Sequence, residues 1–303
     1  MKDKIVITGA CGHIGSALIR SRSLDKYNVI AVDNFLTQRY TSLFHLRNNI
    51  KFYEADFLNI DYPEGSTVIH LAAITDAASS MLNPKQLEEI NITKTKQLID
   101  KCIESKVKRF IFPSSTSVYG VAAELVNEDD AKFENPQSPY AQSKIEIEKY
   151  LESKKGEIEY IIPRFGTIFG ISPGMRFHTA INKFCWQSSL NQPITVWKEN
   201  YEQVRPYLGL KDCLKSIKHF INLDSGLCNT KYNVLTGNYK LSDVVEIIKT
   251  TNQDLEVKFV DTPLLNQFSY NVDDSKVKST GFKSEESLDI GVLDIFNILK
   301  NLK

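Results

Sequence analysis

No stretch constrains the fold of this chain more than residues 5–19. Ile5-Val6-Ile7 is a short apolar run with two β-branched types, as expected of a strand buried on both faces of a parallel sheet. A glycine-rich turn follows it, and a helix is expected to open at Ser16. The turn reads Gly9-Ala10-Cys11-Gly12-His13-Ile14-Gly15.

Each glycine of this turn has a use in holding a phosphate. Gly9 permits a tight turn, Gly12 lets the backbone approach a pyrophosphate, and Gly15 lets the helix pack closely on the strand. The helix N-terminus adds amide donors and a positive dipole end. The spacing is GxxGxxG rather than the commoner GxGxxG. Placed between a strand and a helix, the pattern predicts a dinucleotide site.

Strands and helices alternate through the first half of the chain. Further strand-like runs cover 29–32, 50–55, 67–73 and 109–112, and helical periodicity extends over 84–102. This order predicts βαβ units and an α/β fold, a Rossmann-like doubly wound parallel sheet. Ligands bind such sheets at the carboxyl ends of the strands, where the glycines, Asp33 and Asp56 fall.

Asp33 ends the second expected strand, about 20 residues beyond the glycines. A carboxylate there accepts hydrogen bonds from the adenosine ribose hydroxyls and repels a 2′-phosphate, which predicts NAD rather than NADP. The alternative is a solvated turn aspartate before Asn34. Arg39 is close enough to complicate the choice, and we interpret it as a surface residue.

Tyr140 and Lys144 are spaced i, i+4, which places both side chains on one face of a helix. A nearby ammonium stabilises a phenolate, so the pair can form a general base that works near neutral pH. The hydroxyl-rich stretch 114–117 follows another strand and is expected to face this pair. A hydroxyl, a phenol and a lysine over a dinucleotide site make an arrangement for hydride transfer.

Composition excludes several other classes. Lys+Arg and Asp+Glu both number 37 in the 303 residues, which gives no support to nucleic acid or an anionic membrane as partner. Five scattered cysteines show no metal-ligand spacing, so we expect reduced thiols and no metal. No apolar run approaches the ~20 residues of a membrane span. The chain enters its first strand at once, and we expect a cytoplasmic protein.

Taken together, these motifs resemble the extended short-chain dehydrogenase/reductase family, which includes nucleotide-sugar epimerases and dehydratases. The resemblance is carried by GxxGxxG, Asp33, HLAA at 70–73, SSTSVYG at 114–120 and YxxxK at 140–144. It continues through 163–170, 205–207 and 232–234. It implies an NAD cofactor and a nucleotide-diphosphate sugar substrate.

The resemblance also implies roles for single residues. Ser115, four residues before the tyrosine of VYG, is the expected catalytic hydroxyl. Thr116, the next residue, is an alternative hydroxyl and is expected to bind substrate. Tyr140 is the expected base and Lys144 the ribose-binding lysine that lowers its pKa. The expected cofactor-binding set is completed by Gly9, Gly12, His13, Ile14, Gly15, Asp33, Asn34, Asp56, Phe57, Leu71, Ala72, Ala73 and Asn91.

On the substrate side, Arg205 resembles the family arginine that contacts the diphosphate, because a guanidinium offers paired donors to phosphate. Arg176, in an expected loop over the site, is a second candidate. Thr167 stands where many relatives carry a substrate-binding asparagine. No arginine follows Arg205, whereas hexose epimerases have one near the segment aligned with 263–270. His70 and His178 are interpreted as histidines that pack in the core or reach solvent with the edge of the ring, and not as catalytic residues.

Thr116 and Ser117 occupy the positions where 4,6-dehydratases carry an Asp-Glu pair, and Ser117 that of the glutamate of decarboxylating members. Both reactions are therefore disfavoured. We predict an NAD-dependent nucleotide-sugar epimerase that acts through a 4-keto sugar. The alternatives are a net 4-dehydrogenase and a non-catalytic dinucleotide-sensing protein.

No linker separates the expected lobes, which indicates that they interleave. We expect residues 1–165 and roughly 203–235 to form the NAD-binding domain, and residues 166–202 and 236–303 to form the nucleotide-sugar lobe. The stretches 241–251 and 286–302 show helical spacing. By family resemblance we expect a homodimer.

Overall fold

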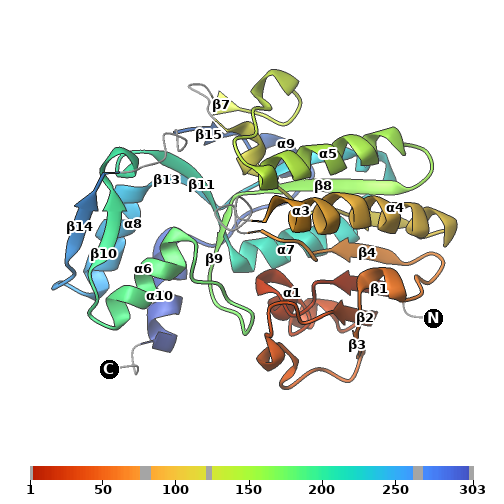
Figure 1. Cartoon of the computed structure of the whole chain (residues 1–303), viewed down its shortest axis with the longest axis horizontal. Helices are drawn as coiled ribbons and strands as arrows, with labels where there is room; N and C mark the ends of the chain where they lie inside the picture. The colour runs from red at the N-terminus through yellow and green to blue at the C-terminus, as the bar shows by residue number, and fades with distance from the viewer. Residues whose placement is uncertain (1–2, 76–82, 121–124, 262–268, 300–303) are drawn as a thin grey trace.

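A parallel sheet of eight strands organises the larger part of the molecule (Figure 1). The structure, a computed structural model, describes residues 3–75, 83–120, 125–261 and 269–299. The strand order is β12-β8-β5-β4-β1-β2-β3, and β6 also pairs with β8. The strands are β1 (Lys4–Thr8), β2 (Asn28–Asp33), β3 (Ile50–Glu54), β4 (Thr67–His70), β5 (Arg109–Ile111), β6 (Ser114–Ser115), β8 (Glu159–Phe165) and β12 (Thr230–Val234). All described pairs in this sheet are parallel.

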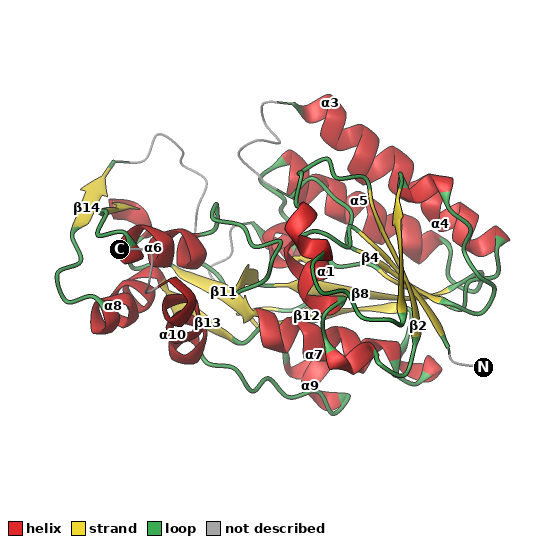
Figure 2. Cartoon of the chain, turned by 90° about the horizontal axis from the view of Figure 1, so that it is seen from below, coloured by secondary structure: helices red, strands yellow, loops and turns green. Residues whose placement is uncertain are grey.

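Helices cover both faces of the sheet, which confirms the predicted doubly wound α/β fold. Figure 2 shows α4 (Lys94–Glu104) and α5 (Pro139–Ser153) on one side, and α7 (Leu210–Ile221) and α9 (Ser275–Ser279) on the other. Helix α1 (His13–Leu18) packs against α7. The expected helix at 84–102 is present as α3 (Pro84–Leu87), a π-helical turn (Glu88–Thr93) and α4.

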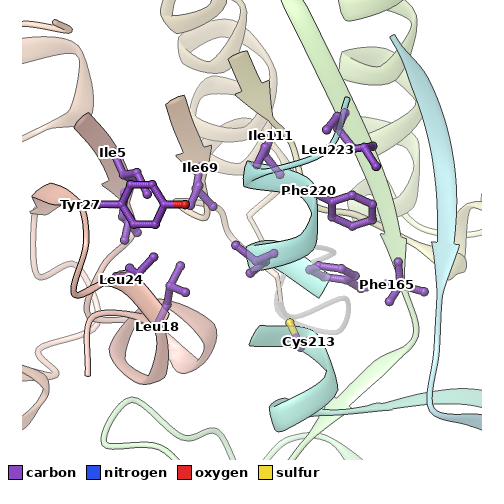
Figure 3. Packing of buried hydrophobic residues seen from close by; sticks show 14 of the residues in the cluster. Ile5, Leu18, Leu24, Tyr27, Ile69, Ile111, Phe165, Cys213, Phe220 and Leu223 are labelled. Carbon is purple, nitrogen blue, oxygen red and sulfur yellow. The ribbon is translucent and has the colours of Figure 1, made fainter. Parts of the chain in front are cut away.

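The apolar run of β1 is explained by burial on both faces. Side chains alternate along a strand, so Ile5 and Ile7 enter one core cluster while Val6 enters the other. The first cluster joins α1 and α7 to the sheet through residues such as Leu18 and Phe220 (Figure 3). The second joins α4 and α5 through residues that include Leu98, Ile99, Ile147 and Leu151.

The direction in which successive strands are added to the sheet reverses between β1 and β4, since β2 and β3 lie on one side of β1 and the later strands lie on the other. At such a switch point the two crossover connections leave toward opposite faces, and a crevice opens at the carboxyl ends of the strands. Gly9 and Leu71, which follow β1 and β4 directly, stand at this crevice.

A smaller part lies to the left in Figure 1. Its three-stranded sheet has the order β13-β11-β9, and β10 pairs with β14. Its core contains buried residues such as Phe169, Phe184, Tyr207, Val244 and Val292. The elements are β9 (Thr167–Phe169), α6 (Ala180–Ser189), β10 (Ile194–Trp197), β11 (Val204–Gly209), β13 (Gly237–Lys240), α8 (Leu241–Thr251), β14 (Val257–Val260) and α10 (Leu288–Leu299), and a separate pair joins β7 (Leu125–Val126) to β15 (Asn271–Val272).

The helices expected near 241–251 and 286–302 are confirmed as α8 and α10. Within the stretch 203–235, β12 pairs in the large sheet, while β11 pairs with β9 and β13. The division of the chain into two domains stays a prediction. In the part of the chain that the structure describes, no helix combines the length and apolar character that crossing a membrane requires.

Candidate active site

Two adjoining cavities open at the carboxyl ends of the strands. The smaller one, of about 100 Å³, extends over the ends of β2 and β3, and the larger one, of about 290 Å³, extends toward β6 and α5. The residues that line both are Gly9, Gly12, Leu71, Ala73 and Arg176. The two cavities therefore form one continuous site with a shared middle.

The glycine loop has the close backbone approaches that its sequence predicts. Gly9 has φ +67°, which favours glycine, and an added Cβ there would lie 2.5 Å from the backbone N of Ala72. An added Cβ at Gly15 would lie 2.3 Å from the carbonyl oxygen of Gly9. Neither position accepts a side chain without a shift of backbone, so the loop lies tightly against the end of β4 and the first turn of α1.

Two carboxylates fix the wall of the smaller cavity. Asp33 accepts hydrogen bonds from the backbone N–H of Cys11 (2.9 Å) and of Phe35 (2.8 Å). Asp56 accepts a hydrogen bond from the Leu58 amide (3.0 Å) and pairs with the Lys94 ammonium at 2.7 Å. Burial acts to raise the pKa of Asp56, but these two donors outweigh it and lower that pKa. Both side chains are thus fixed in position as hydrogen-bond acceptors.

Arg39, interpreted from the sequence as a surface residue, is half-exposed and also lines the smaller cavity. Burial lowers its pKa, and the negative charge of Asp33 opposes that effect. Its Nη1 is buried and has no hydrogen-bond partner among the described residues. The sequence signal was its position a few residues beyond the aspartate that ends β2.

Tyr140 and Lys144 lie in the first turns of helix α5, and the residues at its N-terminus determine where this helix begins. Ser138 is the N-cap, and its hydroxyl accepts a hydrogen bond from the Ala141 amide (3.2 Å). Pro139 occupies the first turn, where its missing N–H leaves no bond unmade. Tyr140 and Lys144 then follow one turn apart and both line the larger cavity.

Ser115, Tyr140 and Lys144 converge on this larger cavity. The Ser115 hydroxyl hydrogen-bonds the Tyr140 side chain. The Lys144 ammonium is buried, donates to the Pro113 carbonyl (2.7 Å), and lies 4.4 Å from the Phe112 ring centroid and 5.7 Å from that of Tyr140. The predicted trio is therefore assembled in space from β6 and α5.

The electrostatics of the trio differ from the expectation. Burial raises the pKa of Tyr140 to about 12, and it is the charge of Arg176, with the Ser115 hydrogen bond, that opposes this rise. Burial also lowers the pKa of Lys144 to about 8, against the effect of the Glu148 carboxylate. Burial therefore outweighs the groups that lower the pKa of Tyr140, and the predicted role of Lys144 in lowering it stays a prediction.

A family model described as "NAD dependent epimerase/dehydratase family" matches residues 5–234, most of the chain. The chain belongs to this family. A Bacillus subtilis member described as an uncharacterized UDP-glucose epimerase, YtcB, is 34% identical over 231 residues, which are 71% of either chain.

Solved structures of epimerases share the whole fold. The UDP-N-acetylglucosamine 4-epimerase of Methanobrevibacter ruminantium M1, in complex with UDP-N-acetylmuramic acid, is 25% identical and superimposes with a TM-score of 0.86 over 98% of this chain and all of its own. The UDP-glucuronic acid 4-epimerase of Bacillus cereus, in complex with UDP-glucuronic acid and NAD, is also 25% identical. Its TM-score is 0.86, over 99% of this chain and all of its own.

For this epimerase/dehydratase family member, the fold gathers most of the predicted site residues around the two cavities. Both predicted sets, for cofactor and substrate, contribute to the walls. The predicted residues that line at least one cavity are Gly9, Gly12, His13, Ile14, Gly15, Asp33, Asn34, Asp56, Phe57, Leu71, Ala72, Ala73, Ser115, Tyr140, Lys144, Thr167 and Arg176.

Three predicted residues do not line either cavity. Thr116 is buried and its hydroxyl donates to the Phe165 carbonyl (3.3 Å), which turns it away from the site. The Asn91 side chain hydrogen-bonds the backbone N and O of Ile74, both at 2.8 Å, and so fixes a residue of the smaller cavity's wall without lining that cavity itself. Arg205 lies over the Tyr270 ring, 5.2 Å from its centroid. Of the aligned segment 263–270, residues 263–268 lie outside the described residues.

The larger cavity also contains polar groups that the sequence did not single out. Thr75, Ser117 and Thr179 are among its lining residues, and their hydroxyl oxygens are buried and have no hydrogen-bond partner among the described residues. His70 and His178 line it as well, and burial lowers the pKa of His70 to about 3. Among residues 3–75, 83–120, 125–261 and 269–299, no group of three His, Cys, Asp or Glu side chains could hold a metal ion.

Proposed function

We propose that this protein is an NAD-dependent nucleotide-sugar epimerase that acts through a 4-keto intermediate. The observation that carries the proposal is the convergence of Ser115, Tyr140 and Lys144 on a cavity that is continuous with the glycine loop. Family membership and the epimerases of the same fold support it. A second supporting feature is the absence of acids at 116 and 117, which dehydratases need.

The residues of the smaller cavity fit the adenosine half of NAD. Asp33 offers a carboxylate to ribose hydroxyls, and the glycine loop leaves room that a Cβ would fill. Asn34, Asp56 and Phe57 would surround the base. When bound, the dinucleotide supplies a hydride acceptor and a positive charge in the same cavity as Tyr140.

Side chains of the protein remove the proton of the sugar 4-hydroxyl and later return it. Tyr140 as phenolate takes the proton of the sugar 4-hydroxyl while the C4 hydride leaves, and Ser115 donates a hydrogen bond to that oxygen. The charge of Arg176 lowers the pKa of Tyr140, and the Lys144 ammonium, 5.7 Å from the ring centroid of Tyr140, would add to the stabilisation of the phenolate when charged. After the keto sugar turns over, Tyr140 returns the proton as hydride reaches the opposite face of C4. The configuration at C4 is then inverted and no cofactor is consumed.

The substrate class follows from the hydroxyl-rich wall. Thr75, Ser117 and Thr179 line this cavity, and rotation of their side chains toward a polyhydroxy ligand would give their unpartnered hydroxyls a hydrogen bond whose lack costs free energy. Thr167 lines the same wall. The related structures hold UDP-linked sugars, both N-acetylated and acidic. We therefore infer a nucleotide-diphosphate sugar, with the base and the sugar left to experiment.

Two further features belong to the proposal. We infer a homodimer, as the resemblance to extended short-chain dehydrogenases implies, and light scattering of the purified protein tests it. We also infer a cytoplasmic site of action, because the five cysteines are all free and buried.

The test is incubation with NAD and UDP-, dTDP-, GDP- and CDP-linked hexoses, N-acetylhexosamines and uronates. Product configuration at C4 is read by NMR, and reduced cofactor by its absorbance. We expect one 4-epimer to interconvert with the other without lasting reduction of NAD. Stoichiometric accumulation of reduced cofactor with a keto sugar would establish the 4-dehydrogenase instead. No conversion of any sugar in the panel would contradict both activities.

A further inference from the structure

The segment between β9 and α6 lies directly on the glycine loop (Figure 1). The His13 ring bonds the Gly170 carbonyl through Nε2 (2.9 Å), and the Gly174 amide donates to the Ser16 hydroxyl (2.9 Å). Burial lowers the pKa of His13 to about 4, so the ring is neutral at pH 7 and its Nε2 carries the proton that the carbonyl accepts. Residues 170–174 are thereby seated on the loop expected to bind phosphate.

Backbone meets backbone at this contact. A Cβ added at Gly174 would lie 2.4 Å from the Cys11 carbonyl oxygen and 2.5 Å from that of Gly12. No side chain separates the two segments at this point. The contact fixes where the segment leaves the glycine loop, and hence where Arg176, two residues further on, enters the site.

Arg176 is the charged residue among the five that line both cavities. Its positive charge acts both near the phosphate-binding loop and near the catalytic residues. It lowers the pKa of His13 in the glycine loop and the pKa of Tyr140 in the larger cavity. A ligand that fills both cavities must pass this guanidinium.

A dinucleotide has its two nucleosides at its ends and its pyrophosphate in the middle. We propose that Arg176 binds the pyrophosphate of the dinucleotide cofactor, from the side opposite the glycine loop. This inference rests on the proposed function and moves Arg176 from the substrate-binding set to the cofactor-binding set. The guanidinium suits the role because it forms paired, charge-assisted hydrogen bonds with phosphate oxygens.

The assignment makes the smaller part of the molecule contribute to cofactor binding. The glycine loop supplies one wall of the pyrophosphate site, and the segment that follows β9 supplies the other. Arg205, the other arginine of this region, lies over Tyr270 and outside both cavities. Replacement of Arg176 is therefore expected to weaken cofactor binding, whereas replacement of Arg205 is not.

The experiment measures binding to protein freed of nucleotide, by calorimetry, with NAD and with ADP-ribose, which keeps the pyrophosphate and lacks the nicotinamide. For Arg176→Gln we expect the Kd of both ligands to rise by a similar factor, about 10- to 100-fold. Arg176→Lys, which keeps the charge and loses the paired donors, should fall between Arg176→Gln and the wild type. Arg205→Gln is the matched control, and its Kd for both ligands should stay within about twofold.

Each outcome decides the assignment. Unchanged Kd values in Arg176→Gln would overturn it while leaving the proposed function in place. A rise for NAD without a rise for ADP-ribose would also overturn it, because the lost contact would then involve the nicotinamide. Wild-type protein that bound neither ligand would remove the dinucleotide site, and the proposed function with it.

Discussion

Tyr140 is the residue whose hydroxyl the proposed chemistry needs most. In the protein without ligands burial keeps it protonated at neutral pH, because its pKa is raised to about 12. The charge of Arg176 and the hydrogen bond from Ser115 oppose this effect. The ionisation of this hydroxyl is therefore set by the balance between its burial and the groups that oppose it, Arg176 and Ser115.

Tyr140→Phe removes this hydroxyl and keeps the ring. We expect kcat to fall by about 10²- to 10⁴-fold, the usual worth of a general base, while the Kd for NAD stays within about twofold. Tyr150→Phe, on the same helix with its hydroxyl bonded to Asp100, is the control and should turn over like wild type. Turnover by Tyr140→Phe at the wild-type rate would show that another group takes the proton.

Lys144 gives the site a pH dependence with a definite sign. Its pKa is lowered to about 8, so it is charged below that pH and neutral above it. Because the charged form stabilises the phenolate, we expect kcat/KM to fall as the pH rises through about 8. In Lys144→Arg the guanidinium stays charged, and this fall should be absent even though the overall rate is lower. The same alkaline fall in both proteins would assign it to a different group.

Some residues of the site could be predicted from the sequence and others could not. Ser115 and Tyr140 were predicted because their roles depend on short motifs. Thr116 was placed in the wall because it neighbours Ser115, but adjacent residues of the turn point to different sides, and its hydroxyl reaches Phe165. Arg39 was not assigned to the site because its position shortly after Asp33 does not by itself tell whether its side chain turns back toward the sheet.

At the scale of elements, the strand, glycine loop and helix of residues 4–18 were predictable because their interactions are local. The π-helical turn Glu88–Thr93 was not. It occurs where the Asn91 side chain reaches the backbone of Ile74, a contact between segments 17 residues apart. The position of the segment after β9 on the glycine loop depends in the same way on contacts, such as that of His13 with Gly170, that no local pattern encodes.

Gly174→Ala tests this contact between elements. The added Cβ would meet two carbonyl oxygens of the glycine loop, so the segment must lift from it. An epimerase has to keep its reduced cofactor until the hydride returns, and we expect NAD to dissociate roughly 10-fold faster in this variant. Displacement of bound cofactor in a stopped-flow instrument measures the rate.

Gly226→Ala is the matched control, because an added Cβ there meets nothing within 4 Å and its φ is not positive. Its dissociation rate should equal that of wild type. Equal rates for Gly174→Ala and Gly226→Ala would mean that the seated segment does not retain the cofactor.

At the scale of the whole molecule, the chain crosses between its two parts several times. It leaves the large sheet after β8, enters β9 directly, and returns to the large sheet only at β12. The interleaving was predicted from the absence of a linker, but the pairing of β12 with β8 could not be, because strands 65 residues apart carry no signal of their register.

A buried ion cluster lies at the end of β8, where this crossing begins. The Arg164 side chain is fully buried and its Nη2 pairs with Glu134 and with Glu148, each at 2.5 Å. Glu148 belongs to α5, and Glu134 also pairs with Lys231 of β12 at 3.3 Å. One guanidinium thus joins the sheet, the helix that holds Tyr140, and the returning strand.

Arg164→Met keeps much of the volume and removes the charge. Two carboxylates would then lose their main partner, one of them the buried Glu148, and removing one member of a buried ion pair costs about 3–5 kcal/mol. We expect that loss in the free energy of unfolding by urea, whereas Lys198→Met, which breaks the exposed pair with Asp261, should cost less than about 1 kcal/mol. If the two variants unfold at similar urea concentrations, the cluster does not stabilise the native state, and the crossing from β8 to β9 must be held by the apolar clusters on either side of it.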